Sequence, residues 1–172
     1  TGKQMHFLTG HDGWVPAVAI SPDGSYALSG GWDRTLRIWD LWTGEAAGMI
    51  AGFSAPLLTI AVLPDGEELL VGTGDGSLHL LKFQPGEFQE STPDLPAGES
   101  GRASEADPAG SKAMPVRGGA LDGRSTPLSA QLPPHKNLSG HTSGINAIIL
   151  TREGRFAITA GDDRTVRVWD LV

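Results

Sequence analysis

An all-β fold made of small antiparallel sheets is the structure that this sequence predicts, and three observations carry the prediction. The phrase GGWDRTLRIWD at residues 30–40 recurs as AGDDRTVRVWD at residues 160–170, with seven of eleven positions identical. Each phrase ends a 31-residue unit, at 10–40 and 140–170, and a more divergent copy occupies 52–82. Apolar residues run in short strand-like stretches bounded by Pro and Gly, without a sustained helical period.

Composition restricts the possible classes of protein. The 172 residues correspond to one domain. The absence of Cys excludes disulfides and thiolate metal sites, and a net charge of −7 argues against a nucleic-acid binder, which needs a basic footprint. No apolar run has the length of a membrane span and no signal peptide is visible, so we expect no membrane insertion and an intracellular location, the cytoplasm first. Because the chain begins at Thr1 rather than Met, we expect a processed product or a piece of a longer protein.

Each unit reads as three strands joined by turns, with a fourth strand between units. In the first unit, residues 15–20 are apolar and end at the turn SPDG, residues 25–29 follow it, and residues 35–39 alternate. Pro fixes one φ angle and Gly tolerates a positive one, so PDG predicts a tight turn. The fourth stretch precedes the GH or GF pair and reads QMHFLTG, EAAGMIAG and PHKNLSG. The spacing of 42 residues from SPDG to LPDG indicates a repeat architecture.

At this point the units resemble those of the WD-repeat β-propeller family, in which a GH pair precedes WD by about 30 residues. The resemblance covers residues 4–83 and 135–172. It implies a partial propeller of about three blades, each of four antiparallel strands, with the repeated phrase as the third strand of a blade. It divides the chain into a first unit at 10–51, a degenerate second unit at 52–88 and a last unit at 134–172.

A low-complexity insert interrupts the pattern at residues 89–133. The spacing from LPDG to TREG is 88 residues, against 42 in the preceding step. The insert is rich in Pro, Gly, Ser and Ala and poor in large apolar residues, so we expect a disordered loop. It is either a passive loop or a regulatory one, and in the second case Thr92 and Thr126, each followed by Pro, are possible phosphorylation sites.

In blades of this family a His, a Ser or Thr, an Asp and a Trp form a buried hydrogen-bond chain, and the resemblance assigns these roles by position. The members are His11, Ser29, Asp33 and Trp39 in the first unit, and His141, Thr159, Asp163 and Trp169 in the last. The second unit keeps only Asp75, because Phe53, Val71 and Leu81 stand at the other positions, so it should depend on apolar packing. A Ser, a His and an Asp also fit a nucleophilic triad. The set occurs twice and ends on Trp, which favours the structural role, and we predict no catalytic residue, metal site or cofactor.

The resemblance also assigns residues to the loop face through which propellers bind proteins and peptides. The candidate partner-binding residues are Trp14, Pro16 and Trp32, then Pro56 and Leu58 beside Gly74, then Asn146 and Asp162 beside Gly144. Trp is enriched at binding hot spots. The alternative for Trp14 and Trp32 is that the two rings only pack on each other, and the sequence leaves both interpretations open.

The expected function is a non-enzymatic protein–protein interaction scaffold, the propeller portion of a larger protein, because the fold hosts many unrelated functions. The alternative is a sensor or autoinhibitory propeller of an ATPase or another effector outside this chain, and an enzyme built on the propeller comes last. Three units do not close a ring, so we expect residues 4–9 to form the fourth strand of another blade. Further blades, from the parent chain or another copy, are therefore expected among the partners.

Overall fold

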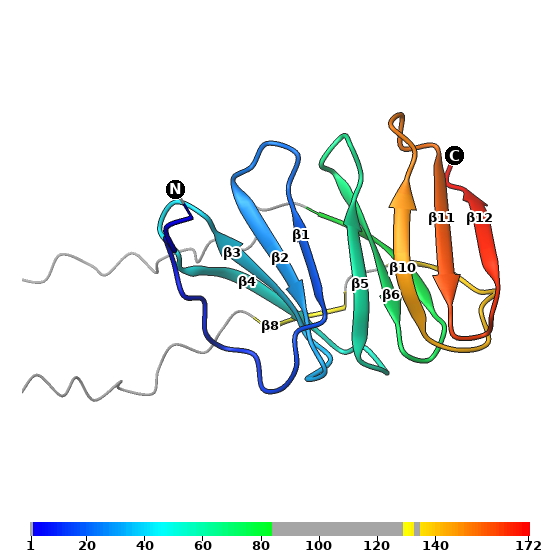
Figure 1. The fold of residues 1–172 in the computed structure, drawn as a ribbon, viewed down its shortest axis with the longest axis horizontal. Coiled ribbons are helices and arrows are strands. Elements are labelled where there is room, and N and C mark those ends of the chain that lie inside the picture. Colours follow the sequence, from blue (N-terminus) through cyan, green and yellow to red (C-terminus); the bar gives the residue numbers. More distant parts are fainter. Residues whose placement is uncertain (1, 84–128, 133–134) are drawn as a thin grey trace, which may run out of the picture. The chain divides into compact units, whose positions relative to one another are not determined.

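The computed structural model describes residues 2–83, 129–132 and 135–172, with side chains for all of these except 129–131. Most of the expected insert, including Thr92 and Thr126, lies outside the described residues. The part of the chain that is described is all-β, as the sequence predicts, and forms three sheets (Figure 1). It contains no helix, so no described helix is long and apolar enough to cross a membrane.

The first blade is an antiparallel sheet that follows the expected order of strands. Its members are β1 (Ala17–Ile20), β2 (Tyr26–Gly30), β3 (Leu36–Asp40) and β4 (Ala46–Ala51), hydrogen-bonded in sequence order. The turn between β1 and β2 is the predicted PDG turn. Gly24 there has a φ of 75°, a left-handed conformation that glycine adopts without steric cost, and Ser21 Oγ accepts the N–H of Tyr26 to close the turn.

The middle and last blades repeat this topology. The middle blade consists of β5 (Leu57–Val62), β6 (Glu68–Thr73), β7 (Leu78–Lys82) and β9 (Lys136–Leu138). Its order, β5-β6-β7-β9, places the expected insert between the third and fourth strands of one blade. The last blade contains β10 (Ile145–Leu150), β11 (Phe156–Gly161) and β12 (Val166–Asp170) in a three-stranded sheet.

Two apolar clusters fill the spaces between successive blades. The first joins Leu28, Leu36 and Ile38 of the first blade to Leu57 and Ile60 of the middle one. The second joins Leu70 and Leu78 of the middle blade to Ile145 and Ala157 of the last. Each sheet is therefore apolar on the face that it turns to its neighbour, and the hydrophobic effect stacks the sheets side by side (Figure 1).

Two expectations about strands are wrong. Residues 4–9 form no strand, although the pattern QMHFLTG predicts one. Among the described residues no third strand lies beside this segment, and a β-segment without a neighbour lacks partners for its backbone N–H and C=O groups. Conversely, β8 (Ser129–Gln131) lies within the expected insert and pairs in parallel with β4. The outer edge of β4 offers unpaired backbone groups, and these three residues occupy it.

Candidate functional site

A hydrogen-bond chain crosses the first blade from Trp39 to Asp33. Trp39 Nε1 lies 2.8 Å from Ser29 Oγ, Ser29 Oγ lies 2.7 Å from His11 Nε2, and His11 Nδ1 lies 2.9 Å from Asp33 Oδ2. Trp39 and Ser29 are buried in β3 and β2, whereas His11 precedes β1. The four side chains come from separate parts of the unit, so their contacts hold the loop before β1 against the sheet.

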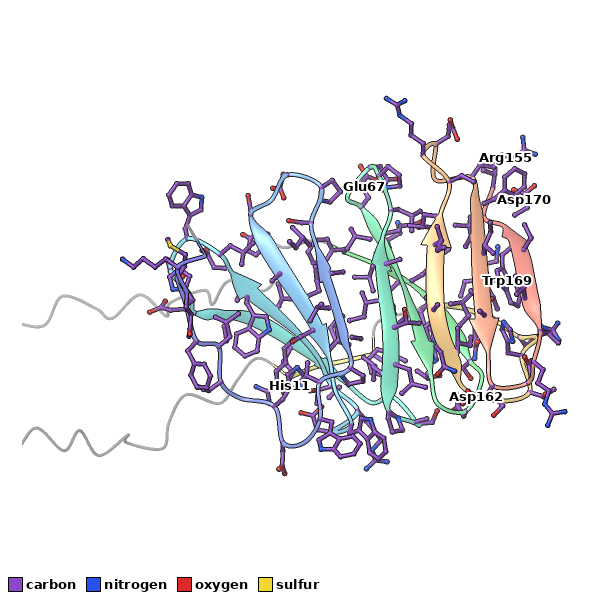
Figure 2. The ribbon with its side chains drawn as sticks, viewed as in Figure 1. His11, Glu67, Arg155, Asp162, Trp169 and Asp170 are labelled. Atoms are coloured by element: carbon purple, nitrogen blue, oxygen red, sulfur yellow. The ribbon has the colours of Figure 1, made fainter. Side chains whose placement is uncertain are left out.

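The last blade contains the same chain with nearly the same dimensions. Trp169 Nε1 lies 2.9 Å from Thr159 Oγ1, Thr159 Oγ1 lies 2.7 Å from His141 Nε2, and His141 Nδ1 lies 2.8 Å from Asp163 Oδ2. Trp169 is labelled in Figure 2 on the outermost strand of this blade. The structure thus brings together, four in each blade, all eight residues that we expected in the two hydrogen-bond chains.

The hydrogen bonds of each chain can run in one direction, from the indole to the carboxylate, with the imidazole in one neutral tautomer. An indole N–H can only donate, so the hydroxyl oxygen of Ser29 accepts a hydrogen bond from Trp39, and its O–H donates one to His11 Nε2. His11 Nε2 is then the acceptor, which leaves the proton on Nδ1, where it donates to the carboxylate of Asp33. Each donor in the chain finds one acceptor, and this is what a buried polar network needs in order to stabilise a fold.

The carboxylate at the end of each chain also binds the backbone around it. Asp33 accepts N–H groups from Asp12 and Thr35 and the hydroxyl of Thr35. Burial by itself raises the pKa of Asp33, but these hydrogen bonds and the one from His11 outweigh it and hold the pKa below its ordinary value. The same balance, with Thr165, His141 and Thr142 as donors, lowers the pKa of Asp163.

A small residue beside the histidine ring is required by the geometry of the chain. A Cβ atom at Gly31 would lie 2.7 Å from His11 Nδ1, and one at Gly161 would lie 2.9 Å from His141 Nδ1. Both distances are shorter than van der Waals contact allows. A glycine is therefore needed directly after β2, at Gly31, and at the end of β11, at Gly161, because the histidine ring packs over it.

The middle blade has apolar packing in place of the hydrogen-bond chain, and its aspartate has different hydrogen-bond partners. Phe53, Val71 and Leu81 are buried in the cluster between the first two blades. Asp75 accepts hydroxyl hydrogen bonds from Ser54 (2.6 Å) and Thr73 (2.7 Å). Burial raises the pKa of Asp75, but these bonds and the N–H of Ser77 outweigh it and lower the pKa to about 2.

Sequence reasoning missed Ser54 and Thr73, although the alignment of the three units contains the signal. Thr73 occupies the position of Gly31 and Gly161, where no histidine ring is present to exclude a side chain. Its hydroxyl is buried and takes over the role of donor to the aspartate. The middle blade thus has threonine at this position and no histidine ring beside it.

The Ser–His–Asp geometry has the distances of a nucleophilic triad but a different environment. Ser29 is buried and its oxygen accepts the indole N–H of Trp39. A catalytic serine presents its oxygen to the substrate carbonyl. In the last blade the hydroxyl belongs to Thr159, which is also buried and also bonded to Trp. This arrangement supports a structural role.

The candidate partner-binding residues lie at one end of the blades, most of them on loops and Leu58 and Asn146 near the start of β5 and β10. The rings of Trp14 and Trp32 contact each other with centroids 5.1 Å apart, and the side chains remain 74% and 52% exposed. The N–H of Trp32 donates to the carbonyl of Trp14 over 2.8 Å. The two rings therefore pack on each other and face solvent at once, and Pro16 beside them is exposed.

The other two blades repeat the same backbone link with different side chains. Gly74 N–H donates to the Pro56 carbonyl over 2.9 Å, and Asp162 N–H donates to the Gly144 carbonyl over 2.8 Å. Leu58 packs against the loop of the last blade, where a Cβ at Gly144 would lie 3.0 Å from its Cδ1. Asn146 Nδ2 donates to Asp162 Oδ1 over 2.5 Å. Figure 2 shows Asp162 and His11 at one end of the blades and Glu67 and Arg155 at the opposite end.

Comparison with known proteins identifies the repeat. The family described as WD domain, G-beta repeat matches residues 2–40 and 132–170. The nuclear distribution protein PAC1 of Arthroderma otae is 26% identical over 178 residues, which cover 99% of this chain and 39% of that protein. A periodic tryptophan protein 2 homolog of Neurospora crassa is 32% identical over 89 residues, covering 52% of this chain and 10% of its own length.

A third relative resembles a shorter part of the chain more strongly. The small ribosomal subunit protein RACK1 of Caenorhabditis elegans is 58% identical over 40 residues, which cover 23% of this chain and 12% of that protein. The chain therefore spans well under half the length of each of these three relatives. The two segments that match the family contain strands β1–β3 and β10–β12 and all members of both hydrogen-bond chains. On this evidence the chain belongs to the WD-repeat family.

Proposed function

We propose that this chain is a non-enzymatic protein-interaction scaffold and that its docking surface is the loop end of the blades. The observation that carries the proposal is the Trp14–Trp32 pair, two large aromatic side chains that touch each other and stay exposed. Trp is among the residues most enriched at binding hot spots, because it buries a large area at a small cost in side-chain entropy.

The loop end changes in chemistry from the first blade to the last. It begins with the two indole rings, continues with Pro56 and Leu58, and ends with Asn146 bonded to Asp162. Indole faces attract prolyl or aliphatic side chains and cations, and an exposed carboxylate attracts donors. The best-fitting partner is an extended peptide with an apolar or cationic residue for the indoles and a donor for Asp162.

Two further considerations support a scaffold rather than an enzyme. The histidine, hydroxyl and carboxylate groups of the first and last blades are engaged in hydrogen-bond chains that end on Trp39 and Trp169. The RACK1 relative is by name a protein of the small ribosomal subunit. By extension, we place the present chain inside the cell, in a larger assembly.

A peptide display experiment tests the proposal. A library of random peptides is selected on the whole chain, and each selected peptide is titrated against Trp14→Ala, Trp32→Ala and Trp42→Ala. Trp42 is the matched control, because it is an exposed tryptophan in the turn between β3 and β4. We expect the first two variants to weaken binding by tenfold or more, about 1.4 kcal/mol, and Trp42→Ala to leave it unchanged. Equal effects of all three, or a library without binders, would contradict the proposal.

A further inference from the structure

The outer edge of β4, the side of this strand that faces away from β3, holds a segment from a distant part of the chain. Ser129–Gln131 (β8) pair with Met49–Ala51 in parallel, whereas every other pairing of strands within the described residues is antiparallel. The sheet of the first blade thereby has five strands, against four in the middle blade. β8 is therefore an addition to the blade rather than one of its four strands.

One side chain anchors this segment to the blade. Leu132, which follows β8 directly, is partly buried and packs against the apolar cluster between the first and middle blades. Gly52, the residue after β4, lies against it, since a Cβ at Gly52 would be 3.6 Å from the Cβ and the N of Leu132. The occupied site thus consists of three backbone pairs and, one residue further along, a place for an apolar side chain.

β8 covers only half of this edge. β4 runs from Ala46 to Ala51, and within the described residues Ala46–Gly48 have no strand beside them on the outer side. Pro127, two residues before Ser129, provides a chemical reason for the short pairing. A proline has no N–H to donate and is unfavourable within a ladder. A strand without this proline has the chemistry to pair along all six residues of β4.

Neighbouring blades leave an outer edge of this kind open. The middle blade has a blade against each of its faces, yet in the described part of the chain its outermost strand β9 pairs with β7 alone. Blades contact each other through the faces of their sheets, where the two apolar clusters lie. A further blade on the free face of the first one would therefore leave the edge of β4 as it is.

We propose that the outer edge of β4 is a strand-addition site for an extended segment of another protein, and that residues 129–132 occupy it as an internal competitor. The partner segment runs parallel to β4, pairs with all six of its residues and places an apolar side chain where Leu132 lies. Strand addition draws affinity from backbone hydrogen bonds and selectivity from the places that receive side chains. The site does not include Trp14 or Trp32, so it is independent of the loop end of the blades.

A second copy of the chain is a poorer occupant than such a partner. Its residues 129–132 would form on β4 the same three backbone pairs that are already present. The internal segment is tethered, which gives it a high effective concentration at the edge, whereas a second copy loses translational freedom on binding. Only a strand that also pairs with Ala46–Gly48 gains hydrogen bonds that the internal segment lacks.

Synthetic peptides titrated against the full chain by fluorescence anisotropy test the proposal. The first has the sequence of residues 126–132, TPLSAQL, and the second, TVLSAQL, carries Pro127→Val. We expect the second peptide to bind about tenfold more tightly, because it can pair along the whole of β4. A third peptide that carries Leu132→Asp in addition should bind about tenfold more weakly than the second, because it lacks the apolar anchor.

A variant of the chain tests the internal competitor. Ala130→Pro with Gln131→Pro removes a ladder bond whichever of these adjacent residues turns its N–H to β4. The double variant should bind TVLSAQL about tenfold more tightly than the wild type does. Its β4 amides should exchange hydrogen faster than those of the wild type until the peptide is added. Trp14→Ala is the matched control, since it alters the loop end and should bind the peptide as the wild type does.

Several outcomes would overturn the proposal. These are equal affinities of the first two peptides, equal affinities of the wild type and the double variant, and unchanged exchange of the β4 amides. A wild-type dimer in light scattering that the double variant abolishes would assign the edge to a second copy, and would overturn it too. Circular dichroism checks that the double variant folds. If it does not, Leu132→Asp in the full chain provides the same comparison with an unaltered backbone.

Discussion

Thr159 Oγ1 stands 2.9 Å from Trp169 Nε1 and accepts its indole proton, while the hydroxyl proton of the same threonine points to His141. One buried hydroxyl thus joins the outermost described strand to the loop before the blade. In the middle blade the three positions are Val71, Leu81 and Phe53, which are buried in apolar contacts. At these three positions a blade therefore has either a complete hydrogen-bond chain or only apolar residues.

The first prediction concerns the loss of that hydroxyl. Thr159→Val preserves the shape of the side chain but leaves buried His141 Nε2 and the partly buried Trp169 Nε1 without their hydrogen-bond partner. We expect the free energy of unfolding to fall by about 1–3 kcal/mol, the cost of unpaired buried polar groups. Urea denaturation followed by tryptophan fluorescence measures it.

The control for this prediction introduces into the last blade all three apolar residues that the middle blade has at these positions. His141→Phe, Thr159→Val and Trp169→Leu together remove every polar member that would be left unpaired. The triple variant should lose less stability than the sum of the three single variants, because apolar groups of similar size need no hydrogen bonds. Additive losses would show that the three residues do not act as a chain.

The second prediction concerns acid denaturation of the middle blade. The pKa of Asp75 is lowered from 3.8 to about 2, so the folded state binds the ionised form better than the unfolded state does. The stability that this carboxylate contributes is fully present above pH 4 and is lost as the pH falls from about 4 to about 2. Asp75→Asn should reduce stability at neutral pH and flatten the acid dependence in that window. Melting temperatures from pH 2 to 6 measure it, with Glu45→Gln, an exposed carboxylate, as control.

The third prediction concerns His79, which stands at the position of Arg37 and Arg167. It is buried, its two ring nitrogens make no hydrogen bond within the described residues, and its ring contacts Phe53 and His135. Burial and the charge of His135 lower the pKa of His79 below 6.5, although Asp75 opposes them. Folding therefore favours neutral His79, and this contribution to stability is lost as the pH falls below 6.5.

Replacement by a side chain that cannot titrate should remove that dependence. His79→Leu should be less sensitive than the wild type to acidification from pH 7 to pH 5, as measured by thermal melting. His6→Gln provides the control, since His6 lies in the segment before the first blade. An unchanged pH profile in His79→Leu would mean that the buried imidazole is not the group responsible.

The fourth prediction concerns Gly76, the counterpart of Arg34 and Arg164. Its φ is 87°, and a Cβ would lie 2.8 Å from the carbonyl oxygens of His141 and Ser143 in the loop of the last blade. Gly76→Ala should therefore destabilise the chain by more than the 1 kcal/mol or so typical of strain at a positive φ. Gly24→Ala is the control, because Gly24 has a φ of 75° and open space around its Cβ position. Equal melting temperatures for the two variants would contradict the steric argument.

Local chemistry in the sequence was enough to predict the strands and turns of the first blade, whereas the two hydrogen-bond chains were predicted from the resemblance to the WD-repeat family. The strands of the first blade begin and end within two residues of the expected bounds, because short apolar runs and PDG turns act through neighbouring residues. The spacing of GH, Asp and WD in two gapless units placed His11 and Trp39, and likewise His141 and Trp169, at fixed positions of a repeated sheet. The repeat made it possible to place these residues in the sheet, which one unit by itself would not have allowed.

Only the tertiary structure decided which segments find a neighbour. Residues 4–9 have a strand-like pattern but no strand beside them, whereas Ser129–Gln131, inside a low-complexity segment, pair with the free edge of β4. The hydrogen bond that joins Thr73 to Asp75 likewise depends on which side chain lies across the sheet. A strand is completed by the backbone groups of another strand, and an apolar face by another face, so local sequence cannot determine whether that partner is present.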